Sequence, residues 1–352
     1  MTAPFAYDVN PARIVFGPGT LARVADEVRR LGARRALVLS TPFQQADAEA
    51  LARQLGTLAA GVFAKAAMHT PVAVTKEAML AFQGVDADCV VALGGGSTIG
   101  LGKAIAYRND TPQIVVATTY AGSEVTPILG QTEDGIKTTV RDPKILPEVV
   151  IYDPNLTLGL PVAMSVTSGL NAMAHAVEAL YAQDRNPISS MLAVEGVRAL
   201  RAALPMIVGN PKDVTARGDA LYGSWLCGTV LGTVGMALHH KLCHTLGGSF
   251  DLPHAETHAI LLPHSAAYNA QAAANELQPL ADLFGGAIGS GLYDFAKSLG
   301  APLALKDLGL QEAQLDAAAD LAVKNPYWNP GPFGRDAVRS LRPRAWEGAR
   351  PQ

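Results

Sequence analysis

Histidine residues that could transfer protons or bind a ligand gather in the second half of the chain. Asn171 and His175 are four residues apart in a helical pattern, and so are His240 and His244, so each pair is expected on one helix face. Histidine changes charge near neutral pH, and several at such spacing indicate a functional site. Seven of the eight histidines belong to this stretch: His175, His239, His240, His244, His254, His258 and His264.

The histidines of this stretch are not expected to play equal parts. His254 comes after a Gly-Gly pair and directly follows Pro253, which predicts a loop that can fold back toward the preceding helix. His239 and His264 are expected to be hydrogen-bonded residues of the helical core, the commoner role of a single histidine. His258 fits either role.

A glycine-rich segment is the second feature that could do chemistry. Residues 94–98 (GGGST) follow an apolar run at 89–93 and precede a helical pattern from about 99 to 107. Glycines let the backbone approach a ligand, and N–H groups at a helix N-terminus attract an anion such as a pyrophosphate. The segment matches neither GxGxxG nor a Walker A loop, so a tight turn without a ligand is the alternative to a nucleotide site.

A hydroxyl-rich loop at residues 118–124 (TTYAGSE) follows another apolar run, residues 113–117. Ligands of doubly wound parallel sheets bind at the carboxyl ends of the strands, so the two loops support each other as one nucleotide site. The residues expected at the nucleotide are Gly94, Gly95, Gly96, Ser97, Thr98, Thr118, Thr119, Ser123, Ser40 and Lys103.

The order of apolar runs and helical patterns predicts the elements that position these residues. Runs at 35–39, 89–93, 113–117 and 149–152 predict strands buried on both faces of a parallel sheet. After about residue 160, alanine- and leucine-rich helical spacing takes over. We therefore expect an α/β dinucleotide-binding domain with a Rossmann-like parallel sheet at residues 1–157, and an all-helical substrate domain at residues 158–352.

Composition narrows the class of protein. The chain has 352 residues and a formal net charge of −3, with no long run of one sign, so no nucleic-acid partner is expected. Hydrophobic residues make up 49% and charged residues 17%, which favours an oligomer, and we expect a homodimer. Cys89, Cys227 and Cys243 form no CxxC pair, which favours buried thiols in a reducing, cytoplasmic compartment.

One uncharged stretch, residues 221–238, reaches the lower length limit of a transmembrane helix. Gly223, Gly228, Gly232 and Gly235 interrupt it, and a His-His-Lys sequence follows directly. We therefore expect a close-packed helix in the protein core and no membrane partner.

The chain resembles the iron-containing alcohol dehydrogenases over nearly its whole length, from Val15 to Pro326. The segments that carry the resemblance are residues 94–97, 118–126, 171–178 and 240–264. The resemblance implies a dinucleotide-binding α/β domain, an all-helical domain, an active site in the cleft between them, and a nicotinamide cofactor.

Cofactor choice depends on the residue after the strand at 35–39. Ser40 stands there in place of the carboxylate that would exclude the phosphate of NADPH, so NADPH is possible. NADH is nevertheless the expected cofactor. Thr119 and Ser123 are expected to hold either the nicotinamide end of the cofactor or a substrate carboxylate.

The resemblance also implies a divalent-metal site, and here the sequence departs from the family. Family members bind the ion through one aspartate and three histidines, and the matching positions are Asn171, His175, His240 and His254. An amide and three neutral imidazoles supply no negative charge to the ion, and an amide oxygen is a poor ligand for zinc or iron. No bound metal is expected.

The loop at 118–123 is one residue shorter than is usual in the family. With Asn171 and residues 239–248, it resembles the branch that reduces 2-maleylacetate to 3-oxoadipate in the bacterial degradation of aromatic and chloroaromatic compounds. That substrate is a dicarboxylate whose carbon–carbon double bond is conjugated to a ketone. Hydride can add to such a bond without a Lewis acid when hydrogen-bond donors stabilise the enolate that forms.

Proton transfer and substrate binding are expected from different residues. The general acid is expected to be His244 first, then His240 and His254, with His175 lining the site. The residues expected at the dicarboxylate substrate are Asn171, Lys241 and Ser123.

Three other functions are compatible with the sequence. A metal-dependent alcohol or polyol dehydrogenase of the same family would use Asn171 as a ligand and would contain stoichiometric zinc or iron. A lyase similar to dehydroquinate synthase would need a metal and show no net consumption of NADH. A catalytically silent nucleotide-binding module would retain the cofactor without turnover, and the histidines argue against it.

Overall fold

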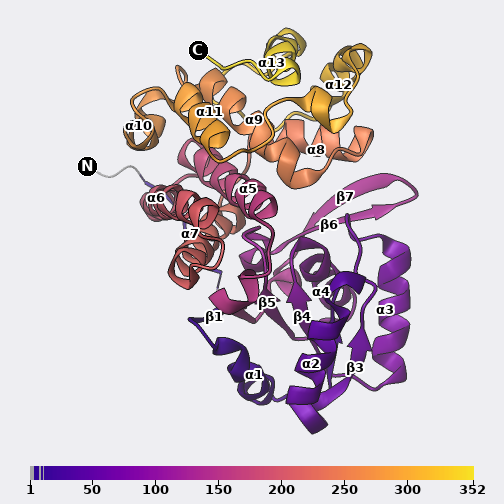
Figure 1. Cartoon of the computed structure of the whole chain (residues 1–352). Coiled ribbons are helices and arrows are strands. Elements are labelled where there is room, and N and C mark those ends of the chain that lie inside the picture. The colour runs from indigo at the N-terminus through magenta and orange to yellow at the C-terminus, as the bar shows by residue number, and fades with distance from the viewer. Residues whose placement is uncertain (1–3, 8, 11) are drawn as a thin grey trace. The chain divides into compact units, whose positions relative to one another are not determined.

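The computed structural model describes residues 4–7, 9–10 and 12–352 (Figure 1). By internal packing the chain divides into two compact units. Residues 9–160 and 212–221 form one, here called the α/β unit. Residues 161–211 and 222–352, together with residues 4–7, form the other, called the helical unit.

A six-stranded sheet forms the centre of the α/β unit. Its strands are β1 (Arg13–Phe16), β2 (Ala36–Leu39), β3 (Ala59–Phe63), β4 (Cys89–Gly94), β5 (Gln113–Ala117) and β8 (Val149–Tyr152). Their order is β1-β8-β5-β4-β2-β3, and each neighbouring pair is parallel. The four strands expected from the apolar runs are all present and buried along their whole length. The prediction of a parallel sheet is confirmed.

Helices cover both faces of this sheet. On one face, α1 (Val24–Arg30) and α2 (Gln45–Leu55) pack on side chains such as Val38 and Val91. On the other face, α3 (Val72–Gly84) and α4 (Gly96–Asn109) pack on the alternate residues, such as Leu37 and Val90. Successive side chains of a strand point to opposite faces, so each strand contributes to both cores. This explains why the strand sequences are continuous apolar runs.

Sequence analysis missed the two edge strands and a hairpin. Only one residue each of β1 and β3 is buried, and their short apolar stretches, IVF and AAGVF, were not singled out as strands. The hairpin pairs β6 (Ile128–Glu133) with β7 (Ile136–Arg141) in antiparallel register. Asp134 and Gly135 form its turn with φ values of 50° and 75°. An Asp-Gly pair is a strong hairpin signal that could have revealed it.

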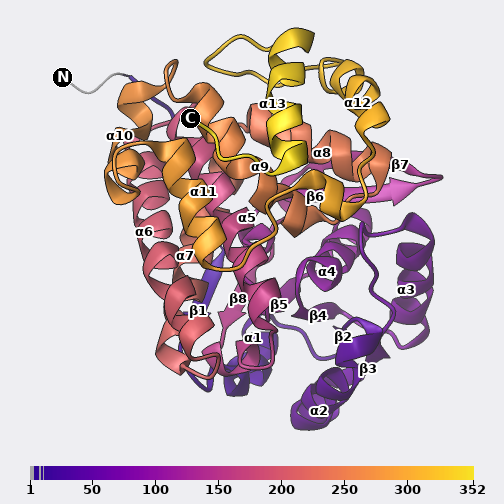
Figure 2. The ribbon, with the colours of Figure 1, turned by 45° about the horizontal axis from the view of Figure 1, so that its top comes forward.

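Among its described residues, the helical unit has helices joined by loops and no strand. Its α-helices are the C-terminal part of α7 (Val214–Thr233) with α5 (Val162–Leu180), α6 (Pro187–Gly209), α8 (Leu238–Phe250), α9 (His254–Asn269), α10 (Ala274–Leu283), α11 (Ile288–Ser298), α12 (Leu315–Ala322) and α13 (Arg335–Glu347). In this unit α5 packs against α6 and α9, and α9 also packs against α8 and α11 (Figure 2).

The uncharged stretch at 221–238 forms the second part of α7 and a break before α8. A Cβ atom on Gly196 of α6 would lie 2.7 Å from Sγ of Cys227, and one on Gly223 would lie 2.8 Å from Cγ of Leu200. These glycines let α6 and α7 pack backbone against backbone. In the described parts of the chain no single helix has the length and apolarity of a membrane span, although α7 and α8 together, bent by 95°, meet that criterion by length and composition.

The unit boundaries differ from the expected ones in three segments, of which residues 4–7, expected in the α/β domain, pack with the helical unit. Residues 158–160 and 212–221, expected in the helical domain, pack with the α/β unit. The physical cause is Arg217, whose side chain is fully buried and donates hydrogen bonds to the hydroxyl of Tyr120 and to the carbonyl of Leu160, both at 3.1 Å. The first turns of α7 are therefore part of the α/β core.

Candidate active site

Three helices of the helical unit bring six of the histidines together. α5 carries Asn171 and His175, and the other two helices are α8 and α9. Neighbouring ring centroids lie between 4.3 Å and 6.1 Å apart. The histidines of this cluster are His175, His239, His240, His244, His254 and His258.

The expectation that His254 lies on a loop is wrong. His254 is the first residue of α9, directly after Pro253 at the N-cap. The two glycines that suggested a loop, Gly247 and Gly248, lie inside α8. The chain turns instead at Asp251, whose φ of 54° is left-handed, and proline favours the helix start that follows.

The carboxylate of Glu178 on α5 organises the start of α8. It is fully buried, and its two oxygens accept hydrogen bonds from the backbone N–H of His239 at 2.6 Å and of Ala237 at 2.8 Å. A carboxylate at a helix N-terminus is stabilised by the free N–H groups there. Glu178 therefore fixes the direction from which α8 presents His240.

Glu178 also bonds to the imidazole of His240. Its Oε2 lies 2.6 Å from Nδ1 of His240, which consequently donates its proton to the carboxylate. Nε2 of His240 then faces Nδ1 of His175 at 2.8 Å. The result is a buried chain of hydrogen bonds from a carboxylate through two imidazoles.

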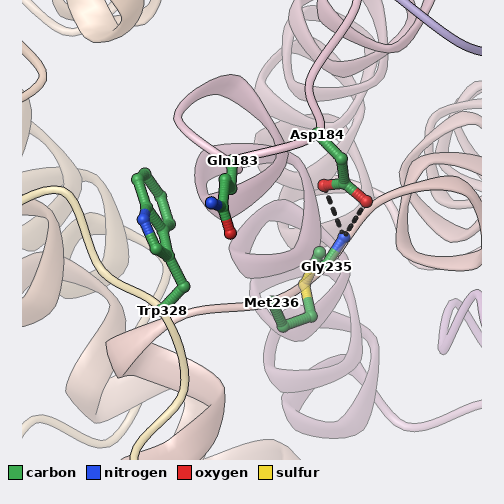
Figure 3. A pocket seen from close by; sticks show the side chains of 5 residues that line it. All are labelled: Gln183, Asp184, Gly235, Met236 and Trp328. Carbon is green, nitrogen blue, oxygen red and sulfur yellow. Dashed lines mark hydrogen bonds between the residues drawn. The ribbon is translucent and has the colours of Figure 1, made fainter.

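A pocket beside the break between α7 and α8 shows how that break is held (Figure 3). Gln183, Asp184, Gly235, Met236 and Trp328 line it. The carboxylate of Asp184 accepts the backbone N–H of Gly235 at 2.9 Å and 3.2 Å from its two oxygens (Figure 3). Glu178 and Asp184 thus anchor both sides of the break, and the pocket itself brings together no histidine.

Some members of the cluster are more accessible than others. His175 and His240 are buried, whereas His244 and His254 are partly exposed. Nδ1 of His244 lies 3.1 Å from the hydroxyl of Tyr327. His244, which the sequence placed first as general acid, is thus more accessible than His240, and their ring centroids are 5.9 Å apart.

Lys241 completes this accessible part of the cluster. Its Nζ lies 5.6 Å from the centroid of the Tyr327 ring, within the range of a cation–π contact. Partial burial lowers the pKa of Lys241 and raises that of Tyr327. An ammonium group and a phenol hydroxyl here can both contact an anionic ligand.

The innermost histidines stay neutral near pH 7. His239 and His258 are fully buried, and burial, reinforced by the neighbouring imidazoles, holds the pKa of each well below its usual range. His264, further along α9, is also buried, and burial lowers its pKa to about 4. These properties suit the structural role expected for His239 and His264.

Asn171 offers a free acceptor in the buried part of the site. Its side chain is buried, and its Oδ1 has no hydrogen-bond partner. A buried acceptor without a partner is costly, so a bound ligand that donates to it is favoured.

The four positions that match the family's metal ligands do not suit a divalent ion. Asn171 supplies a neutral amide oxygen, and the other three positions, His175, His240 and His254, are imidazoles, so the donor set carries no negative charge. The carboxylate of Glu178 is committed to the backbone of α8 and to the far nitrogen of His240. This donor chemistry disfavours the zinc or iron site of the family.

In the α/β unit, the glycine segment forms a tight turn from β4 into α4. The φ of Gly94 is 156°, and a Cβ there would lie 2.5 Å from Oγ1 of Thr98. A Cβ on Gly95 would lie 2.7 Å from Cγ2 of Thr119. Helix α4 begins at Gly96, three residues before the expected start near residue 99, because glycine, serine and threonine are weak helix formers that fit a helix N-terminus.

The loops after β4 and β5 lie side by side. The backbone N–H of Thr118 donates to the carbonyl of Gly94 at 3.1 Å. Three nearby hydroxyls are buried without a hydrogen-bond partner, Oγ1 of Thr98, Oγ of Ser123 and Oγ of Ser40. Backbone N–H groups at the start of α4 and unpartnered hydroxyls around them fit the pyrophosphate and ribose groups of a dinucleotide.

Lys103 of α4 bonds to the segment that follows the loop after β5. Its side chain is buried, and Nζ donates to the carbonyls of Ser123, Thr126 (2.8 Å) and Ile128 (3.0 Å) and to the hydroxyl of Thr126 (2.9 Å). Burial lowers its pKa to about 7, against the opposing effect of Glu124. Protein oxygens occupy the ammonium group, so Lys103 positions the loop that begins at Ser123.

The turn after β2 lies next to the same loops. Nε2 of Gln44 donates to Oγ1 of Thr118 at 3.3 Å, and its Oε1 lies 3.0 Å from where a Cβ on Gly94 would be. Phe43, beside it, is 98% exposed. The strand order reverses between β2 and β4, and ligands of such sheets bind at that switch point.

Sequence analysis missed three residues of these sites. Glu178 follows His175 by three positions and Asn171 by seven, a helical spacing that could have identified it. Tyr327 comes from a distant segment, and nothing in its local sequence signals contact with His244. Phe43 lies in a short turn, where a single aromatic residue gives no sequence signal.

Two family models match the chain. Residues 11–154 match the model described as iron-containing alcohol dehydrogenase, and residues 165–346 match the C-terminal model of the iron-containing alcohol dehydrogenase family. Together they cover both units.

Individual relatives agree with this assignment. A maleylacetate reductase of Rhizobium sp. strain MTP-10005 is 68% identical over 99% of each chain. The crystal structure of a maleylacetate reductase from Agrobacterium tumefaciens, also 68% identical, superposes with a TM-score of 0.96 over 99% of this chain and 100% of the other. A sulfoacetaldehyde reductase from Bifidobacterium kashiwanohense, solved in complex with NAD⁺, shares the fold at 23% identity, with a TM-score of 0.88 over 98% and 99% of the two chains.

Proposed function

The chain belongs to the iron-containing alcohol dehydrogenase family, in which it is an oxidoreductase of the maleylacetate reductase branch, and we propose that it reduces 2-maleylacetate to 3-oxoadipate with NADH and without a metal ion. The balanced reaction takes one hydride from the cofactor and one proton from a general acid. Both are added across the carbon–carbon double bond of the substrate.

The α/β unit is proposed to hold the dinucleotide. The start of α4 and the residues Gly94, Gly95, Gly96, Ser97 and Thr98 would bind the pyrophosphate, as the unpartnered hydroxyls and close glycine contacts support. Reduced nicotinamide supplies the hydride when it is bound. Thr118, Thr119 and Ser123 would orient its nicotinamide end.

The adenosine end is proposed to lie at the turn after β2. Ser40 provides a hydroxyl and no carboxylate, so NADPH can also bind. The exposed ring of Phe43 would stack on the adenine, because an aromatic face stacks on any base and is otherwise unfavourable in water.

The helical unit is proposed to hold the substrate. The ammonium group of Lys241 would pair with a substrate carboxylate. Asn171 is available to bind the substrate through its unpartnered oxygen and its amide donors. With no metal ligand carboxylate at position 171, the pocket presents histidines and a lysine, which suit a dicarboxylate.

Proton delivery is assigned to the histidine cluster. Hydride adds to the carbon β to the ketone, and negative charge develops on the ketone oxygen as an enolate. His244, hydrogen-bonded to Tyr327, would donate the proton to the α carbon, and His240 and His254 are the further donors. Glu178 accepts the Nδ1 proton of His240, so Nε2 of His240 accepts the hydrogen bond from Nδ1 of His175.

Metal independence follows from the donor set and the substrate. The four family positions carry no anionic ligand, and a conjugated double bond accepts hydride more readily than an isolated ketone. Preorganised hydrogen-bond donors can replace the Lewis acid in this reaction.

The single observation that carries the proposal is the hydrogen-bonded chain from Glu178 through His240 to His175 at the positions where the family binds metal. NADH oxidation with freshly prepared maleylacetate, followed by absorbance and by identification of 3-oxoadipate, tests it. Turnover with this substrate and none with simple alcohols or aldehydes is expected. Turnover only with alcohols and added metal would contradict it.

The assembly is proposed to be a homodimer. Its support is the high apolar and low charged fraction of the chain. Light scattering on the purified protein, with a mass of twice 36.7 kDa expected, tests this proposal.

A further inference from the structure

Three buried side chains next to the proposed catalytic histidines form a separate group, and each has an atom that could bind a metal ion. They are His239 and Cys243 of α8 and His258 of α9. Their ligand atoms all lie within 4.8 Å of one another. Nε2 of His239 is 3.0 Å from Nδ1 of His258 and 3.6 Å from Sγ of Cys243. None of the three matches a metal position of the family.

The hydrogen bonds around His239 fix which of its nitrogens carries a lone pair. The hydroxyl of Ser265 donates to the carbonyl of Leu261 at 2.9 Å, so its oxygen accepts the proton on Nδ1 of His239, also at 2.9 Å. The neutral ring therefore presents an unprotonated Nε2 to Cys243 and His258. A second residue that fixes the tautomer of a histidine is typical of histidines that bind metal.

His258 is incompletely satisfied by the protein. Its Nδ1 bonds to His239, but its Nε2 is buried without a hydrogen-bond partner. Nδ1, which already faces Nε2 of His239, is the atom placed to share an ion with it.

The group also supplies the negative charge that the four family positions lack. Deprotonated Cys243 provides one charge as a thiolate. Thiolate and imidazole together are the preferred ligands of zinc and similar ions.

We propose that His239, Cys243 and His258 form a binding site for one thiophilic divalent cation of the zinc class. Two imidazoles and a thiolate leave the fourth position of a tetrahedral ion to water. On binding, the thiol of Cys243 loses its proton to solvent and the proton of His258 moves from Nδ1 to Nε2, so one proton is released for each ion. The two nitrogens, now 3.0 Å apart, must separate to about 3.3 Å around a tetrahedral ion with the usual bond lengths.

The ion is distinct from a Lewis acid for the substrate. It lies among residues that are at most 2% exposed, so it enters slowly and does not contact the accessible face of His244. It would fix His258 beside His240, where the ring centroids are 5.0 Å apart, and it would thereby restrict the proposed proton donors. Added zinc should accordingly lower turnover after long incubation.

Cobalt(II) binding to the metal-free full-length protein tests the site without substrate. Tetrahedral cobalt with a thiolate ligand has an intense sulfur-to-metal charge-transfer absorption. We expect this absorption to saturate at one cobalt per chain after overnight anaerobic incubation, with release of one proton, and to disappear when zinc displaces the cobalt.

Matched variants separate this site from other positions. Cys243→Ser should remove the charge-transfer absorption and weaken zinc binding at least tenfold, and His258→Asn should weaken binding while the absorption remains. Cys89→Ala is the control, because Cys89 is buried in β4 and burial raises the pKa of its thiol to about 12, and it should bind as the wild type does. Far-UV circular dichroism confirms that each variant is folded.

Three results would overturn the proposal. They are a wild-type protein without the charge-transfer absorption, a Cys243→Ser variant with an unchanged cobalt spectrum, and cobalt binding that Asn171→Ala abolishes while Cys243→Ser leaves it intact. The proposed reductase activity does not enter these measurements, so its failure would be recognised separately.

Discussion

Glu178 and His240 share a buried hydrogen bond of 2.6 Å between Oε2 and Nδ1, although they lie on different helices. The bond fixes the tautomer of His240 and directs its other nitrogen to His175. Position 171, where the family has a metal-binding aspartate, carries an amide in this chain. The buried carboxylate of the site belongs instead to Glu178 and bonds to His240. Glu178 is bonded there to an imidazole and to the backbone N–H groups that begin α8.

Replacement of Glu178 tests this arrangement. Glu178→Gln keeps an oxygen for the N–H groups of α8 but replaces the charged acceptor of the His240 Nδ1 proton with a neutral amide, so we expect kcat to fall about 10- to 100-fold. The KM for NADH should not change, because the cofactor residues lie in the α/β unit. Steady-state kinetics measure both. Glu195→Gln, on α6 and partly exposed, is the control and should leave both values unchanged. Unchanged kcat in Glu178→Gln would show that the bond is only structural.

The accessible histidine is expected to matter most for turnover. His244→Gln removes the proposed general acid, and we expect kcat to fall about 10²- to 10⁴-fold. Tyr327→Phe keeps the imidazole but removes the hydroxyl 3.1 Å from its Nδ1, and a smaller loss of about tenfold is expected. A loss in Tyr327→Phe equal to that in His244→Gln would instead assign the proton to the phenol.

The turn after β2 is expected to set affinity for the cofactor. Phe43→Ala removes the ring proposed to stack on adenine, and the KM for NADH should rise roughly tenfold, which corresponds to about 1.4 kcal/mol, while kcat at saturation is unchanged. Leu80→Ala removes another exposed apolar side chain of the same unit and should have no effect. An unaltered KM in Phe43→Ala would place the adenine elsewhere.

Stability should fall in mild acid because of the buried histidines. His264 has a folded pKa of about 4, below the usual 6.5, so the unfolded chain binds its proton first as the pH falls. Its contribution to the free energy of unfolding is complete above pH 6.5 and is lost between pH 6.5 and 4, by about 3 kcal/mol.

Chemical denaturation as a function of pH measures this contribution. Between pH 7 and 4, the wild type should lose about 3 kcal/mol more than His264→Gln, which has no titrating group at this position. Parallel pH profiles for the two proteins would contradict the assignment.

The sheet was largely predictable because its strands are buried on both faces. Residues 89–93 and 113–117 carry continuous apolar runs, which only a strand covered by helices on both sides needs. The edge strands β1 and β3 also carry short apolar stretches, but these are only partly buried and were not recognised as strands. The position of α7 in both units was not predictable either, since it depends on where the buried guanidinium of Arg217 finds its partners.

The histidine cluster was predictable as a group, but its internal order was not. Helical spacing placed His240 and His244 together, and the structure brings their rings to 5.9 Å. Which histidine is accessible, and which is paired with a carboxylate, depends on how α5, α8 and α9 pack. Lys103 shows the same limit, because its position in α4 does not reveal that loop carbonyls surround its ammonium group.

The dependence of turnover on metal tests the account most directly. NADH oxidation with maleylacetate should be measured on protein treated with EDTA, on untreated protein, and on protein briefly exposed to Fe²⁺ or Zn²⁺, with bound metal quantified in each sample. We expect full activity after EDTA, no stoichiometric iron, and no increase on addition of either ion. Loss of activity with EDTA that Fe²⁺ or Zn²⁺ restores would show that Asn171 and its neighbours bind a working metal and would contradict the account.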